Sequence, residues 1–281
     1  MAEFLEGTVV AEALMADVKQ RTEKLIDKGV TPGLGTILVG GDGPSASYVK
    51  KKHEACEAVG IQSFHANVSE TSSQDVLLKI VNEFNLNPEI DAYIIQHPLP
   101  KRFNFNEAMG KMDPSKDADG LHPVNLGKLV LQEPAPLPCT PAGILAMLDH
   151  YNLDLTGKNV VVVGRGPTLG RPLSLLLASR GIDAAVTVVH SKVADISQYT
   201  KEADVVIGAV GKPSIITKDM VKPGAIVVSG GISWEGKKLL PDVDESVGEV
   251  ASWITPRLGG VGPTTVALLL RNTVEAAESA L

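Results

Sequence analysis

The stretch NVVVVGRGPTLGRPLSLLLASRG, residues 159–181, joins a β-branched run to a glycine-rich turn and an amphipathic, helix-forming segment. Its glycines Gly164, Gly166 and Gly170 form a G-x-G-x-x-x-G arrangement. Glycine lets the backbone approach a pyrophosphate, and the amino terminus of the following helix offers unpaired N–H groups and a partial positive charge. The stretch therefore predicts a Rossmann-like dinucleotide site. The simpler alternative is a tight strand-to-helix turn without a ligand.

Apolar β-branched runs recur along the chain, with helix-length segments between them. This alternation is typical of α/β folds with parallel sheets, and the nearly all-apolar later runs are typical of strands covered on both faces. Besides 159–164, the runs are TILVG at 36–40, IQSFHANV at 61–68, DAYIIQ at 91–96, TVVH at 187–190, DVVIGAVG at 204–211 and AIVVSGG at 225–231. We therefore expect two parallel sheets.

A length of 281 residues favours two domains, and the four prolines in 129–143 indicate a boundary there. The expected fold class is α/β, with an N-terminal α/β domain at 1–138 and a Rossmann-like, doubly wound parallel sheet at 139–264. A cleft between the two domains is expected. Apolar residues at helical spacing predict a C-terminal helix at 265–281 that packs back on the first domain.

The composition is that of an ordinary globular protein, with 44% hydrophobic and 21% charged residues. The net charge of -7, without a run of Lys and Arg, argues against a nucleic-acid partner. Cys56 and Cys139 lack metal-ligand spacing, so we expect reduced, buried thiols and no metal. The sequence contains neither a signal peptide nor an apolar stretch of membrane-spanning length, which predicts a cytoplasmic protein without a membrane partner.

The second strand of the expected dinucleotide domain ends in Val189-His190-Ser191-Lys192. An NAD-specific site usually places an acidic residue here, on the ribose 2′-hydroxyl. Ser191 and Lys192, together with Arg165 of the glycine turn, suit a 2′-phosphate better, because a hydroxyl and two cations satisfy its charge. We therefore predict NADP. The alternative is that both cations are solvated surface charges.

In the first half, the predicted helix YVKKKHEACEAVG places Tyr48 and Lys52 on its apolar side, one turn apart. A lysine in an apolar stripe is costly unless it snorkels, is paired, or is deprotonated for chemistry. On spacing alone, a snorkelling lysine competes with a catalytic one.

Two polar positions lie where parallel-sheet proteins place ligands, at a strand end and in a turn. Gln96 ends the run DAYIIQ, and Asp119 precedes a glycine in KDADG. Asp119 is a candidate binding residue, with an Asx turn as the alternative. Asp113 and Asp117 are interpreted as helix or turn caps.

Seven motifs together resemble those of the bifunctional methylenetetrahydrofolate dehydrogenase/cyclohydrolase family. Their order and spacing match over nearly the whole chain, although each alone is weak. They are Tyr48-x-x-x-Lys52, Gln96 with PLP at 98–100, KDADGLHPVNLGKLVL at 116–131, PLPCTPAG at 136–143, GRGPTLGRP at 164–172, HSK at 190–192 and GGVGPTTVALLLRNT at 259–273.

The resemblance implies NADP-linked oxidation of 5,10-methylenetetrahydrofolate to the methenyl form, followed by hydrolysis to 10-formyltetrahydrofolate. It implies that Lys52 assists proton transfer in hydrolysis, a role that suits lysine because desolvation lowers the pKa of an ammonium group toward neutrality. It also implies that Tyr48 orients the folate, that Gln96 helps to set Lys52, and that Asp119 accepts hydrogen bonds from the pterin. These four residues would form the catalytic and folate-binding set within 1–138.

The resemblance further implies a tetrahydrofolate derivative as partner and a homodimer formed through the cofactor domains, in a pathway that serves purine biosynthesis. The implied cofactor-binding residues are Gly164, Arg165, Gly166, Gly170, Ser191, Lys192 and Ile232. Gly259, Gly260 and Pro263 would line a loop that contacts both the cofactor and the folate substrate.

Several positions depart from the usual family pattern, and most of them lie in the cofactor half. They are His97, Gly166, Ser229-Gly230, Pro241 and Arg257-Leu258. Two alternatives therefore stay open at this point. One is a single-activity cyclohydrolase with a weakened dehydrogenase, and the other is a catalytically silent dinucleotide-binding sensor.

Overall fold

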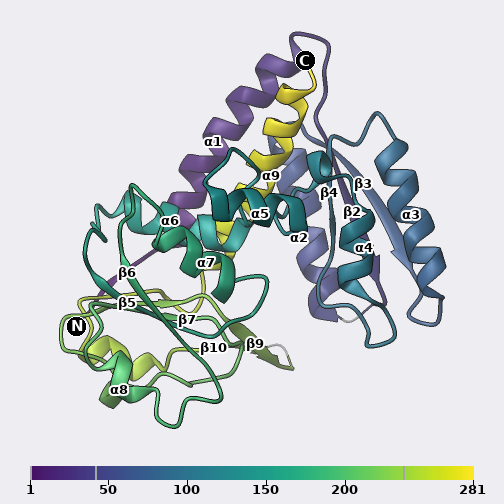
Figure 1. Ribbon diagram of the computed structural model, residues 1–281. Coiled ribbons are helices and arrows are strands. Elements are labelled where there is room, and N and C mark those ends of the chain that lie inside the picture. The colour runs from purple at the N-terminus through teal and green to yellow at the C-terminus, as the bar shows by residue number, and fades with distance from the viewer. Residues whose placement is uncertain (1, 42, 237) are drawn as a thin grey trace. The chain divides into compact units, whose positions relative to one another are not determined.

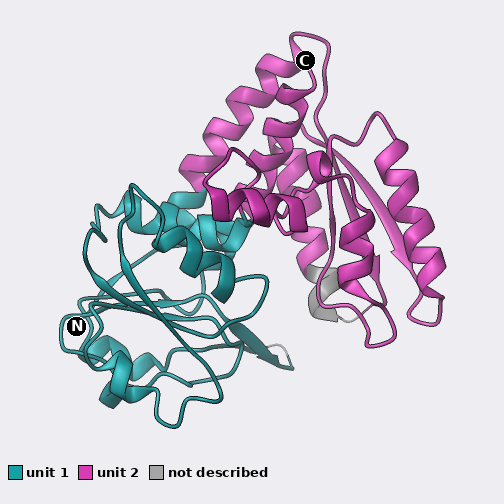
Figure 2. Ribbon diagram, viewed as in Figure 1, with its two compact units in different colours: residues 1–11, 138–265 teal, residues 12–137, 266–281 magenta. Residues whose placement is uncertain are grey.

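The computed structural model describes residues 2–41, 43–236 and 238–281, and of residues 43–47 only the backbone. It divides into two compact units (Figure 2). Unit 1 contains residues 1–11 and 138–265, and unit 2 contains residues 12–137 and 266–281. Each unit has its own parallel sheet, which confirms the predicted α/β fold with two such sheets. Within the described ranges, no helix is both long enough and apolar enough to cross a membrane.

The sheet of unit 1 has six strands in the order β1-β11-β8-β7-β5-β6, and its pairs are parallel. These strands are β1 (Glu3–Phe4), β5 (Asn159–Val163), β6 (Ala185–Val189), β7 (Val205–Gly208), β8 (Ile226–Ser229) and β11 (Trp253–Ile254). The sequence predicted the four longer ones. β1 and β11 have only two residues each, too few for a periodic signal. Their pairing places the first residues of the chain in unit 1.

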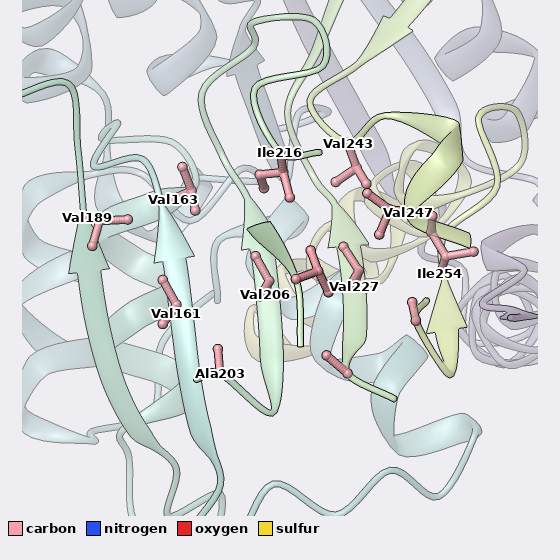
Figure 3. Close-up of a cluster of buried hydrophobic side chains, with 13 residues drawn as sticks. Val161, Val163, Val189, Ala203, Val206, Ile216, Val227, Val243, Val247 and Ile254 are labelled. Carbon is pink, nitrogen blue, oxygen red and sulfur yellow. The ribbon is translucent and has the colours of Figure 1, made fainter. Parts of the chain in front are cut away.

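The central strands of this sheet are almost entirely apolar: β7 is buried at all four positions and β5 at four of its five, as expected for strands covered on both faces. Successive side chains of β5 alternate between the faces. Val161 and Val163 belong to the buried cluster of Figure 3, with Val206 and Val227 of the neighbouring strands. The helices of the unit are α6 (Cys139–His150), α7 (Gly170–Leu177) and α8 (Ser197–Thr200), with 3-10 turns η2 (Lys218–Met220) and η3 (Glu245–Glu249).

Unit 1 also contains an antiparallel hairpin that the sequence did not predict. It consists of β9 (Ile232–Glu235) and β10 (Lys238–Pro241), paired with Ile232 opposite Pro241. Four-residue strands with mixed burial carry little periodic signal.

The sheet of unit 2 has three parallel strands in the order β3-β2-β4. The strands are β2 (Gly33–Val39), β3 (Gln62–Val68) and β4 (Ala92–Ile95). In Figure 1, α3 (Gln74–Leu86) and α4 (Phe105–Lys111) lie on one side of it, where Ile37 and Ile95 pack against Leu77 and Met109. The unit also contains α2 (Gly43–Val59), η1 (Pro114–Lys116), α5 (Pro123–Leu131), most of α1 (Gly7–Ile26) and most of α9 (Val261–Ser279).

The predicted C-terminal helix is present as α9. Leu270 and Val274, two of its apolar positions, are fully buried. Arg21 of α1 forms ion pairs with Glu275 and Glu278, the latter at 2.6 Å between Nη2 and Oε2. Because both helix segments belong to unit 2, these contacts attach the end of the chain to that unit.

Candidate active site

Lys52 lies on the buried face of α2, as its position in the apolar stripe predicted. Its side chain is only 4% exposed, whereas Lys50 and Glu54 of the same helix lie in solvent. The Nζ atom of Lys52 donates a hydrogen bond of 3.0 Å to Oε1 of Gln96. A buried ammonium needs such an acceptor, because an isolated charge in the interior is very costly. The lysine is therefore held inside unit 2 and does not snorkel.

Tyr48 and Gln96 complete the surroundings of this ammonium. Nζ of Lys52 lies 4.7 Å from the centroid of the Tyr48 ring, within range of a cation–π interaction. Gln96 directly follows β4, and its side-chain amide donates to the carbonyl of His97 at 2.8 Å. That bond directs Oε1 of Gln96 toward Lys52, because the amide nitrogen is already engaged. Three of the predicted residues therefore form one connected group.

Asp119 reaches the same edge of this sheet through a short parallel pairing. Tyr93 of β4 pairs with Asp117, and the N–H of Ala118 donates to the carbonyl of Tyr93 at 3.2 Å. Because the pairing is parallel, Asp119 continues in the same direction as Ile95 and Gln96. Asp119 is half-buried. Desolvation lowers the pKa of His97, and the negative charge of Asp119 partly offsets that lowering.

Carboxylates hold the turn that contains Asp119. Asp113 caps η1 by accepting from the N–H of Ser115, which confirms its interpretation as a cap. Asp117 is buried, and its Oδ2 accepts from the N–H of His122 and from Nδ2 of Asn125. These bonds determine the path of the chain on both sides of Asp119.

Sequence reasoning assigned no role to Asn272, which belongs to the motif at 259–273. Its buried amide nitrogen donates to the carbonyls of Ala118 and Leu137, at 2.9 and 3.1 Å. Asn272 thereby supports the residue next to Asp119 from α9. The available signal was a polar amide in the largely apolar helical run VALLLRNTV, which indicates a buried hydrogen bond.

The glycine turn of unit 1 has the tight geometry that its sequence predicted. Gly164 has φ +126°, and a Cβ there would lie 2.2 Å from the carbonyl oxygen of Ala209. A Cβ on Gly170, the first residue of α7, would lie 2.3 Å from the carbonyl oxygen of Gly164. Around Gly166, by contrast, a Cβ would meet no atom within 4 Å. The outer part of the turn therefore has open space beside the amino terminus of α7.

The pairing of β5 with β6 places the segments that contain Arg165 and Ser191 at the same end of the sheet. Val163 is opposite Val189, and the N–H of Gly164 donates to the carbonyl of Val189 at 2.8 Å. Arg165 follows the last residue of β5 by two positions, and Ser191 follows the last residue of β6 by two positions, in the turn closed by the N–H of Val193 and the carbonyl of His190. Arg165, Ser191 and Lys192 are all exposed, so this edge offers two cations and a hydroxyl to an anion.

The remaining predicted residues also lie in or next to unit 1. Ile232 begins β9 and is 47% exposed. Gly259 has φ +77°, and its carbonyl accepts from the N–H of Thr8 at 3.0 Å. Gly260 directly precedes α9, and Pro263 is in its first turn. These three residues form the turn into α9.

Unit 1 combines a doubly wound parallel sheet with this glycine turn, and the chain also holds a buried lysine–glutamine pair. These features define a nicotinamide-dinucleotide enzyme of the α/β class. Residues 5–119 match the catalytic domain of tetrahydrofolate dehydrogenase/cyclohydrolase, and residues 138–281 match its NAD(P)-binding domain. The chain belongs to the tetrahydrofolate dehydrogenase/cyclohydrolase family.

Individual relatives agree along their whole length. The bifunctional protein FolD of Syntrophotalea carbinolica is 66% identical over 279 residues, which cover 99% of this chain and 96% of that protein. The structure of the bifunctional FolD of Campylobacter jejuni has 39% identity and a TM-score of 0.95, with 100% of both chains covered. That of the Trypanosoma brucei dehydrogenase-cyclohydrolase, complexed with NADP and an inhibitor, has 34% identity and a TM-score of 0.94, covering 99% and 98%.

These matches confirm the predicted family, fold class, enzyme type and NADP cofactor. The roles of individual residues stay predictions, which the geometry above makes specific.

Proposed function

We propose that this chain oxidises 5,10-methylenetetrahydrofolate with NADP and hydrolyses the methenyl product to 10-formyltetrahydrofolate, with Lys52 as the catalytic residue of hydrolysis. The observation that supports this role most directly is the Lys52 ammonium, buried in unit 2, hydrogen-bonded to Gln96 and 4.7 Å from the Tyr48 ring. A buried lysine in such a setting suits proton transfer near neutral pH better than it suits packing. An apolar residue would provide the same packing without the desolvation cost of a charge.

In the hydrolytic step, water adds to the methenyl carbon and loses one proton. The bond from that carbon to N5 then breaks as the new hydroxyl group loses its second proton and becomes the formyl oxygen, and N5 gains a proton, so that one proton is released overall. We assign the movement of these protons to Nζ of Lys52. Gln96 keeps Nζ in place through its side-chain oxygen, and Tyr48 offers a ring on which the flat pterin system can stack. Asp119 accepts hydrogen bonds from the amino and ring N–H groups of the pterin.

The residues of unit 1 fit a phosphorylated dinucleotide. Gly164 and Gly170 allow the close backbone packing of the turn, and the open space at Gly166 leaves room for a pyrophosphate at the amino terminus of α7. Arg165, Ser191 and Lys192 present the charge that a 2′-phosphate requires. When bound, NADP supplies the acceptor for the hydride that leaves the methylene carbon. The chain contributes to that step by orienting the cofactor and the folate relative to each other and by excluding water.

One assay tests the proposal and its alternatives together. The protein is mixed with 5,10-methylenetetrahydrofolate and either NADP or NAD, and reduced cofactor, methenyl and 10-formyl products are followed separately. We expect all three products, with NADP preferred. The same reaction is run with Lys52→Met and with Lys51→Met, whose side chain is exposed one residue away on the same helix.

The alternatives give different patterns. A single-activity cyclohydrolase with a weakened dehydrogenase hydrolyses added methenyltetrahydrofolate but reduces little cofactor, and a silent sensor does neither. A preference for NAD would overturn the assigned 2′-phosphate site. Hydrolysis at the normal rate in Lys52→Met would overturn the role of Lys52.

We further propose a cytoplasmic homodimer, formed through the cofactor domains, that supplies one-carbon units for purine biosynthesis. The family resemblance supports the dimer and the pathway. A mass measurement in solution tests the dimer, and a monomer at working concentrations would contradict it.

A further inference from the structure

Asp242, which directly follows β10, holds a backbone loop that lies 30 residues and more away in the sequence. Its side chain is fully buried. Oδ2 accepts from the N–H of Val210 at 2.7 Å, and Oδ1 accepts from the N–H of Lys212 at 2.8 Å. The N–H of Gly211 also favours the charged form of this carboxylate. Three consecutive N–H groups of the loop 209–212 therefore surround one carboxylate.

Successive N–H groups that converge in this way form an anion-binding concavity, a feature that proteins commonly use for phosphates. Gly211, in the middle, has φ +71°, a conformation that favours glycine. Here the anion is the chain's own side chain. Burial raises the pKa of Asp242, and the three N–H groups oppose that rise. The carboxylate therefore fixes the loop at successive N–H groups.

Two glycines provide the space for this carboxylate. A Cβ on Gly231 would lie 2.1 Å from Oδ2 of Asp242 and 2.6 Å from the nitrogen of Gly211. A Cβ on Gly208, the last residue of β7, would lie 2.7 Å from Cβ of Asp242. The carboxylate therefore fits between the ends of β7 and β8 and leaves the loop 209–212 little freedom.

The loop lies at the edge of the sheet where doubly wound folds bind their ligands. It begins at Ala209, whose carbonyl oxygen would be 2.2 Å from a Cβ on Gly164 of the glycine turn. The pyrophosphate is expected at the end of β5 and the 2′-phosphate at the end of β6. Since β7 is the neighbour of β5 on the other side, the nicotinamide half of the dinucleotide extends toward the end of β7.

Two apolar side chains at this edge are exposed. Val210 and Ile232 are both 47% exposed, and the carbonyl oxygen of Ile232 would be 3.2 Å from a Cβ on Gly211. An apolar wall of this kind suits the face of a nicotinamide ring better than it suits water.

We propose that Asp242 is a positioning residue for NADP, because its carboxylate holds the loop 209–212 in the conformation that receives the nicotinamide half of the cofactor. This inference rests on the proposed cofactor site. It assigns no contact between Asp242 and the cofactor, and the effect passes through the loop.

The test uses Asp242→Asn in the full-length protein. The amide keeps the shape of the side chain but turns an NH2 group toward one of the loop N–H groups, so one acceptor is lost. We expect KM for NADP to rise about tenfold, the size of effect that one lost buried hydrogen bond produces. Hydrolysis of added methenyltetrahydrofolate, which needs no NADP, should keep its rate. The matched control is Asp244→Asn, which removes a carboxylate that caps η3 by accepting from the N–H of Ser246 at 3.0 Å.

The outcomes separate this inference from the proposed function. An unchanged KM for NADP in Asp242→Asn would overturn the inference, and so would an equal rise in Asp244→Asn or a parallel loss of hydrolysis. Should Asp242→Asn not fold, Gly231→Ala tests the same point, because its methyl group would displace the carboxylate; a normal KM there would overturn the inference. Absence of NADP turnover in the unmodified protein would instead overturn the proposed function.

Discussion

Nζ of Lys52 and Oε1 of Gln96 lie 3.0 Å apart, inside unit 2, although 44 residues separate them in the sequence. The helix α2 supplies the first residue and the end of strand β4 supplies the second. A charged donor and a neutral acceptor form one of the stronger hydrogen bonds in proteins. The pair therefore determines where the ammonium group is held.

Replacement of Lys52 by methionine should abolish hydrolysis and leave folate binding intact. Methionine preserves the apolar stem and its packing but carries no transferable proton. We expect the cyclohydrolase rate to fall by about a hundredfold or more, the usual contribution of general acid–base catalysis. Folate affinity, measured by calorimetry, should change little. Loss of binding together with rate would mean that Lys52 serves structure and not catalysis, and Lys51→Met controls for the loss of a positive charge on α2.

Replacement of Gln96 by alanine should misplace the ammonium group. The variant removes the acceptor of a charge-assisted bond, which contributes about 1.5–3 kcal/mol, so kcat for hydrolysis should fall by about tenfold or more. The effect should be smaller than that of Lys52→Met. Gln74→Ala is the control, because Gln74 also bonds the backbone, at Asn104, but on α3. Equal losses in the two glutamine variants would contradict a specific role for Gln96.

Replacement of Asn272 by alanine should weaken folate binding as well as stability. Its amide supports Ala118, the neighbour of Asp119, and Leu137 within the proline-containing stretch 129–143. One buried and one partly buried carbonyl lose their donor, which should lower the free energy of unfolding by about 2–3 kcal/mol. KM for the folate substrate should rise while KM for NADP stays constant. Ser279→Ala, near the end of α9, serves as control, and a variant with lower stability but unchanged folate KM would show that Asn272 acts on folding alone.

Replacement of Arg165 or Ser191 by alanine should lower the preference for NADP over NAD. Each side chain is expected to bond the 2′-phosphate, which NAD lacks. A hydrogen bond to a charged group contributes about 1.5–3 kcal/mol, so KM for NADP should rise about 10- to 100-fold in the arginine variant, with a smaller rise in the serine variant. KM for NAD should not change. Lys201→Ala, an exposed cation beyond α8, is the control, and equal changes with both cofactors would argue against the assignment.

Replacement of Asp113 by alanine should destabilise the protein at neutral pH but not in acid. Hydrogen bonds from the hydroxyl and the N–H of Ser115 hold the pKa of Asp113 below its usual value. A folded-state pKa below the unfolded one contributes stability above the unfolded value, and this contribution is lost as pH falls through the folded pKa. We expect a loss of about 1 kcal/mol at pH 7, typical of a cap, which begins to shrink below about pH 4 and vanishes once the pH lies below the folded-state pKa.

Thermal unfolding of Asp113→Ala and of the unmodified protein across this pH range measures the difference. Asp149→Ala, an exposed carboxylate on α6, is the control. A constant difference from pH 7 down to pH 3 would show that the ionised carboxylate is not the origin of the effect.

The cofactor half could be predicted in detail because its signals are local. The strand β5, the turn at Gly164 and the helix α7 follow one another within twenty residues, and their order alone indicates a dinucleotide turn. The hairpin of β9 and β10 was missed, because four-residue strands of mixed burial carry no clear periodicity.

The folate half was predictable in its residues but less so in its geometry. Helical spacing placed Lys52 on the buried face of α2, and that placement is confirmed. Spacing could not show whether the ammonium is paired or snorkels, because its acceptor comes from another element of the sheet. The family motifs named Gln96, and the structure showed the bond.

The sequence by itself determined the two parallel sheets, the glycine turn, the buried side of α2 and the family of the chain, because side-chain periodicity and turn residues act over a few neighbouring positions. Only the tertiary structure decided that Gln96 accepts from Lys52, that Asn272 supports the residue beside Asp119, and that Asp242 holds the loop 209–212. Those contacts join residues 30 to 154 positions apart. Such distances are closed only when whole sheets and helices pack, and no local pattern records which buried donor will meet which acceptor.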